Sequence, residues 1–177
     1  MKTVLAKSFL TCIATAFLLL GLSPSLQAKK IGFPADDPAF TFNLPDGWTT
    51  ETGKDGSLDC TAGDGSEFKI AFVASPSVEN ADDAKALLPK VLKAMSEGMK
   101  CENYKADEAK SGNVGKVSLV AMEAHCKVDG TEMSLNAVVF SVAPGKYFSL
   151  MGAASKEVDK AHNKDMNGII GSIAAVE

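Results

Sequence analysis

Few side chains in this sequence could carry acid–base or nucleophilic chemistry, because its 177 residues include only two histidines, His125 and His162. His125 directly precedes Cys126, and a histidine activates a thiol when the two side chains meet. The segment around them alternates as a strand does, however, and adjacent strand residues point to opposite faces. His162 falls in the apolar stripe of an expected helix, where an edge-of-core histidine with one hydrogen bond is the ordinary outcome. We therefore predict no Cys–His nucleophile.

The motifs of known catalytic and metal sites are absent from the sequence. It contains no His-Glu-x-x-His, no paired Cys-x-x-Cys, no phosphate-binding glycine loop and no EF-hand spacing. The fragment nearest to Gly-x-Ser-x-Gly, residues 63–67, is better interpreted as a hairpin loop. Four acidic residues cluster in sequence around two turns: Asp55, Asp59, Asp64 and Glu67. A solvated acidic loop is favoured over a loose calcium site for them. We predict no catalytic residue, no cofactor and no metal ligand.

Three cysteines follow the first 28 residues, and the spacing of two of them predicts a disulfide. If a hairpin is symmetric about Gly112–Gly115, residues whose numbers add to 227 face each other, and Cys101 and Cys126 satisfy this. Directly opposed residues at a non-hydrogen-bonded site are within reach of a disulfide. Three reduced, buried thiols or a different pairing are the alternatives. Cys60 has acidic neighbours, which disfavour a reactive thiolate, so we expect it to be structural.

The turn Pro45-Asp46-Gly47-Trp48 is the best candidate for a contact with a ligand or a partner. Trp48 is the sole tryptophan of the chain and follows residues with strong turn chemistry. A lone tryptophan after a turn most often caps the core. The alternative is that Trp48, with Pro45, contacts a small ligand or another protein.

The N-terminus has the three-part layout of a secretory signal peptide. Lys2 and Lys7 precede an apolar run of 14 residues, Phe9–Leu22, which is too short to cross a bilayer, and cleavage is expected after Ala28. Cys12 lies at the start of this run and not behind it, so lipidation is not expected. We predict a periplasmic or secreted protein with no integral membrane segment after cleavage.

The composition of the exported part argues against a nucleic-acid partner. All 18 basic residues are lysine, and loss of two of them with the leader lowers the net charge from −4 to −6. Nucleic-acid affinity comes largely from basic side chains that neutralise phosphates, and arginine is the usual residue for bidentate recognition. We therefore predict no binding to nucleic acid.

Hydrophobic periodicity predicts one domain over residues 38–177, preceded by an irregular arm over 29–37. Strands are expected at Phe40–Leu44, at 57–61 and at 67–74. An amphipathic helix should run from Ala81 to about Glu97. Its N-cap is Asn80, and Pro89 should kink it or delay its start.

After this helix, turn chemistry predicts a strand meander with hairpins at Gly112–Gly115, Asp129-Gly130 and Pro144-Gly145. Its strands carry apolar residues on both faces, so both faces must be covered. A second helix, from Lys156 to about Ala174 with Ser155 as its N-cap, supplies the second cover. The predicted fold class is α+β, with a central antiparallel sheet of about six to seven strands and helices on both faces.

The order of these elements resembles the PsbP-like superfamily. The resemblance rests on Phe40-x-Phe42-x-x-Pro45-x-x-Trp48 at the start and on the helix ending at residues 166–173. It implies an α/β/α sandwich and a non-enzymatic helper that binds a larger assembly. The export signal makes bacterial DcrB-like envelope proteins the most similar group, although those are commonly lipoproteins.

The sequence is compatible with three functions. We expect an exported, non-enzymatic envelope protein, monomeric, that acts by protein–protein interaction or as an assembly accessory with an unidentified envelope partner. The alternative is a small-molecule or lipid carrier with a pocket between sheet and helix near Trp48. A hydrolase is the third, and it would need a nucleophile, a base and an oxyanion donor in one cleft.

Overall fold

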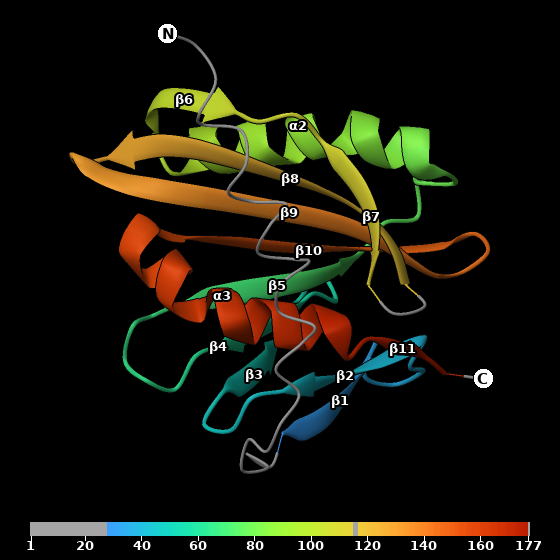
Figure 1. The fold of residues 1–177 in the computed structure, drawn as a ribbon. Coiled ribbons are helices and arrows are strands. Elements are labelled where there is room, and N and C mark those ends of the chain that lie inside the picture. The colour runs from blue at the N-terminus through green and yellow to red at the C-terminus, as the bar shows by residue number, and fades with distance from the viewer. Residues whose placement is uncertain (1–27, 115–116, 177) are drawn as a thin grey trace, which may run out of the picture.

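The computed structural model describes residues 28–114 and 117–176, so the predicted signal peptide up to residue 27 lies outside the described residues. At its centre is an antiparallel sheet of eight strands in the order β3-β4-β5-β10-β9-β8-β6, with β7 also paired to β8 (Figure 1). The predicted fold class is confirmed, with slightly more strands than expected. The strands are β3 (Thr49–Thr52), β4 (Leu58–Thr61), β5 (Lys69–Ala74), β6 (Glu102–Ala106), β7 (Lys110–Val114), β8 (Val117–Val128), β9 (Thr131–Ala143) and β10 (Lys146–Ser155).

The central strands of this sheet bury apolar side chains on both faces. In β9, Leu135 and Val139 belong to the core on one face, and Val138 and Phe140 belong to the core on the other. A strand that is apolar on both faces needs a layer of structure on each side. One face of the sheet is covered by a helix alone, and the other by a helix together with a second sheet.

Helix α2, Ala81–Gly98, covers the first face of the sheet (Figure 1). The side-chain oxygen of Asn80 caps it by accepting hydrogen bonds from the backbone N–H groups of Asp82 and Asp83, at 2.9 and 3.0 Å. Pro89 lies inside the helix but does not delay its start. The residues that α2 buries are Ala84, Leu88, Leu92 and Ser96.

The opposite face is covered by helix α3, Lys156–Gly171, together with a second sheet of three strands. Their order is β1-β2-β11, with β1 at Lys29–Phe33, β2 at Phe40–Leu44 and β11 at Ala174–Ala175 (Figure 1). The prediction of an irregular arm over 29–37 is therefore wrong for its first half, because β1 pairs with β2 along its whole length. A single helix on this face would have left part of it bare.

Aromatic side chains from β2 fill the space between the two sheets. The ring centroid of Phe40 lies 4.9 Å from that of Phe148 and 5.2 Å from that of Phe140. Phe42 lies 4.5 Å from Phe72. Offset and edge-to-face pairs at these distances add to the gain from apolar burial. The small sheet is thus an integral part of the core.

The hairpin before β8 has a different register from the one predicted. Val114 pairs with Val117 and Lys110 with Ala121, so residues 115–116 separate the strands, and those two residues lie outside the described part of the chain. Gly112, placed in a turn by the sequence analysis, lies within strand β7. A second strand, β6, pairs with the far end of β8.

Cys101 and Cys126 nevertheless form the disulfide, with their Cα atoms 5.6 Å apart. Glu102 pairs with Lys127, so the two cysteines are diagonal neighbours and not directly opposed. The predicted pair is the one that the structure joins, but the register used to predict it is wrong. The bond fastens the start of β6 to β8 directly after helix α2.

We expect loss of this disulfide to lower the free energy of unfolding by about 3 kcal/mol, because the cross-link restricts the unfolded chain. The comparison is between wild type and the Cys101→Ser/Cys126→Ser double variant in urea unfolding followed by circular dichroism. Wild type in reductant serves as a second route to the same state. Equal midpoints for the oxidised and the double-variant protein would contradict the expectation.

Candidate functional site

The Pro45–Trp48 turn lies at the edge of the core formed by the two sheets and α3. Trp48 is half-buried and packs against that core, and its backbone N–H donates to the Pro45 carbonyl oxygen at 3.3 Å. Its ring stands edge-on to Phe68 and to the His162 imidazole, with both pairs of centroids 5.9 Å apart. Trp48 therefore closes the core here, while Pro45 stays half-buried beside it.

A second turn, Gly63–Glu67, lies against the first. A Cβ atom added to Gly63 would come within 2.0 Å of the Gly47 carbonyl oxygen, so the two backbones approach too closely for any side chain at that position. Gly47 itself has φ of +80°, a conformation that other residues adopt rarely. The close approach fixes the loop that carries Asp64 and Ser66 beside Trp48.

His162 joins this loop to helix α3. Its Nε2 atom lies 2.9 Å from Ser66 Oγ and 3.1 Å from Asp64 Oδ2, and its Nδ1 atom lies 3.0 Å from Asp165 Oδ2. The ring stacks on Phe68 at 4.5 Å and is almost fully buried. The prediction of an edge-of-core histidine with one hydrogen bond underestimates both its burial and its number of partners.

The distances among Ser66, His162 and Asp165 resemble those of a Ser-His-Asp triad, but the hydrogen bonds do not. Ser66 Oγ donates to Asp64 Oδ1 at 2.6 Å, and a hydroxyl has a single hydrogen to donate. The hydroxyl therefore has Asp64 Oδ1 as a closer acceptor than His162 Nε2 at 2.9 Å, whereas in a triad the serine proton is directed to the histidine. The group is a polar cross-link between a loop and a helix, and it gives no support to a hydrolase.

The electrostatics of Asp64 agree with this interpretation. Hydrogen bonds from the Ser66 hydroxyl and the Ser66 backbone N–H lower the pKa of Asp64, and the charge of His162 acts in the same direction. The carboxylate is therefore held in its ionised form, as the acceptor of the cross-link.

We expect His162→Ala to lower the free energy of unfolding by about 2 kcal/mol or more, because it removes buried ring packing and leaves Asp165 and the loop unpaired. Lys164→Ala, an exposed change on the same helix, is the matched control. Urea unfolding can be followed by the fluorescence of Trp48, which reports on this corner directly. An equal shift in both variants would contradict the cross-link.

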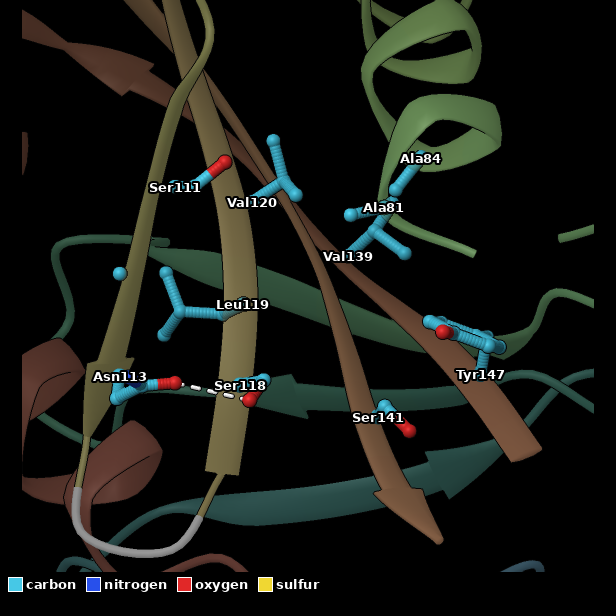
Figure 2. Close-up of a pocket in the computed structure, with 11 residues that line it drawn as sticks. Ala81, Ala84, Ser111, Asn113, Ser118, Leu119, Val120, Val139, Ser141 and Tyr147 are labelled. Carbon is cyan, nitrogen blue, oxygen red and sulfur yellow. Dashed lines mark hydrogen bonds between the residues drawn. The ribbon is translucent and has the colours of Figure 1, made fainter. Parts of the chain in front are cut away.

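Neither of two open cavities in the described part of the chain includes Trp48 or Pro45. The first, of about 350 Å³, lies between the start of α2 and the β7–β8 hairpin (Figure 2). Its polar lining includes Asn113 and Ser118, which hydrogen-bond to each other at 2.8 Å. The second, of about 260 Å³, lies beside Cys126. Neither of these two cavities is the pocket expected for a carrier near Trp48.

The structure also brings together possible metal ligands that the sequence analysis missed. One donor atom each from Asp107, Glu123 and His125 lies within 4.8 Å of the others. The alternation of β8 could have placed Glu123 and His125 on one face, but nothing in the sequence pattern points to Asp107. Cys126, the neighbour of His125 in sequence, lies on the opposite face of β8.

Solved structures show which fold this is. CyanoP, the cyanobacterial PsbP of Synechocystis, aligns with a TM-score of 0.64 over 89% of this chain and 99% of its own, at 14% identity. LpqN of Mycobacterium tuberculosis aligns with a TM-score of 0.51 over 85% of this chain and 91% of its own, at 13% identity. No protein-family model matches the chain, and no curated protein matches its sequence. The fold is PsbP-like.

The same PsbP-like fold occurs in a Ran-binding protein of Saccharomyces cerevisiae. That protein aligns with a TM-score of 0.58 over 86% of this chain and 97% of its own, at 8% identity. The resemblance inferred from the order of elements is confirmed, with an envelope protein among the neighbours. Identities this low establish the fold alone. Neither helix of this PsbP-like domain, in the part that the structure describes, has the length and apolar character needed to cross a membrane.

Cys60 of the PsbP-like domain is a free and fully buried thiol on β4. Burial, assisted by the negative charge of Asp59, raises the pKa of Cys60 to about 12. The reactive thiolate is therefore almost unpopulated at neutral pH. The geometry agrees with the structural role expected from the sequence.

We expect Cys60 in the folded protein to resist a thiol reagent such as iodoacetamide at pH 8, and to react fully in urea. Mass spectrometry of the intact protein counts the added groups in each condition. Modification of the folded protein at the rate seen in urea would show that the thiol is accessible, contrary to its burial.

Proposed function

We propose that this chain is an exported, non-enzymatic envelope protein that acts by contact with another protein. The observation that carries the proposal is the PsbP-like fold over almost the whole described chain. Two proteins with this fold are named for such roles: one as involved in cell envelope biogenesis and one as Ran-binding. The hydrogen bond of Ser66 Oγ to Asp64, which is shorter than its contact with His162, supports the non-enzymatic part.

An exported location is supported by three independent features. The N-terminal layout is that of a signal peptide, and the Cys101–Cys126 bond suits an oxidising compartment. Strand β1 begins at Lys29, directly after the expected cleavage site, so cleavage after Ala28 would leave every strand of the domain intact. A periplasmic or secreted protein is the location that accommodates all three.

The Pro45–Trp48 turn is the proposed contact surface. Asp46 and Gly47 are exposed at its tip. The Trp48 ring packs against Phe68, and the backbone of Gly47 lies close to Gly63 of the Gly63–Glu67 loop. Strand β3 continues from it as an edge strand whose four residues are all exposed. A rigid exposed turn beside an unpaired strand edge suits binding to a protein surface.

The test is site-specific photo-crosslinking in bacteria that export the full chain. A photoreactive residue at Asp46 should yield a cross-linked partner, because the turn contacts it directly. The same residue at Lys164, exposed on α3, is the matched control and should yield none.

The same cells provide the test of location. The protein from the periplasm or medium should have a mass that begins at Lys29. Cytoplasmic retention of the uncleaved chain would overturn the exported assignment. A lack of cross-links at Asp46, together with no partner recovered from envelope extracts, would overturn the binding assignment.

A further inference from the structure

The candidate metal ligands lie on the α3 side of the large sheet, where β6 leaves β8. Glu123 and His125 are two residues apart on β8 and therefore project from the same face. The backbone N–H of Asp107, directly after β6, donates to the Glu123 carbonyl oxygen at 2.9 Å. This bond fixes Asp107 beside the other two residues, so all three start from well-defined backbone positions.

The donor atoms are close to the spacing that a bound metal ion requires. One atom from each residue lies within 4.8 Å of the others, and His125 Nε2 lies 3.6 Å from Glu123 Oε1. Ligands about 2.1 Å from a tetrahedral ion lie roughly 3.4 Å from one another. The His125–Glu123 pair is thus near that spacing, and a bound ion would draw the three side chains closer together.

The surroundings of the trio carry an excess of negative charge in a partly buried place. Asp159 of α3 lies nearby and is held by Asn136 Nδ2 at 2.8 Å. Asp159 and Asp107 bring negative charge close to Glu123, while His125 and Lys110 bring positive charge. A divalent cation among these carboxylates would relieve their repulsion.

We propose that Asp107, Glu123 and His125 form a binding site for a divalent transition-metal ion of the Zn²⁺ type. An imidazole with two carboxylates suits Zn²⁺ or Mn²⁺, whereas Ca²⁺ and Mg²⁺ prefer oxygen ligands alone. Asp107 and His125 are exposed, so the ion would keep one side open to solvent. The site lies on a different element from the Pro45–Trp48 turn and does not depend on the proposed function.

Zn²⁺ titration of the metal-stripped full domain by isothermal calorimetry, with native mass spectrometry for stoichiometry, tests the proposal. We expect one ion per chain. His125→Ala and Glu123→Gln should each weaken binding by about 10-fold or more, since each removes a ligand. Asp55→Asn, an exposed acidic residue in another loop, is the matched control and should bind as wild type does.

A second readout separates a site from non-specific surface binding. In NMR spectra of the labelled domain, Zn²⁺ should shift the His125 ring signals and leave those of His162 unchanged. Circular dichroism establishes that each variant is folded. An absence of binding, or binding that survives both His125→Ala and Glu123→Gln, would overturn the proposal.

Discussion

The structure depends on one constraint: the long central strands β8, β9 and β10 are apolar on both faces, so neither face can be left to water. Helix α2 satisfies the first face alone, with a stripe of small and branched residues. The second face is wider than one helix, and α3 shares it with the three-stranded sheet. The small sheet covers this face through three aromatic rings: Phe33 of β1, and Phe40 and Phe42 of β2. These rings pack directly on Phe72, Phe140 and Phe148 of the large sheet.

Elements stabilised by their own residues can be predicted from the sequence, whereas elements stabilised by distant partners cannot. Strand β2 alternates within itself, and α2 has its own cap and apolar stripe, so both could be predicted locally. Strand β3 is Thr-Thr-Glu-Thr and fully exposed, and therefore shows no alternation. β11 has only two residues and exists through its pairing with β2. Such elements depend on partners distant in sequence, which local patterns do not reveal.

The error in the hairpin register has a similar physical origin. Gly112-Asn113 has the composition of a turn, yet both residues belong to the exposed strand β7, where a glycine meets no neighbouring atoms. Glycine weakens a central strand far more than an edge strand, so turn chemistry misleads at edges. The predicted disulfide still forms because Cys101 and Cys126 are only two positions out of register, so they remain neighbours on the same face of the strand pair.

The same constraint explains where polar chemistry occurs. Under the small sheet and α3, the second face of β9 presents Val138 and Phe140, but near the β6 end the same face presents Asn136, with Glu123 and His125 beside it on β8. The alternation of β8 that places Glu123 and His125 on one face is visible in the sequence. The contact of His162 with Ser66 and that of Asp107 with Glu123 join segments distant along the chain, so the sequence does not reveal them. A sheet face becomes polar where its cover ends, and that boundary is where a site could be accommodated without exposing the core.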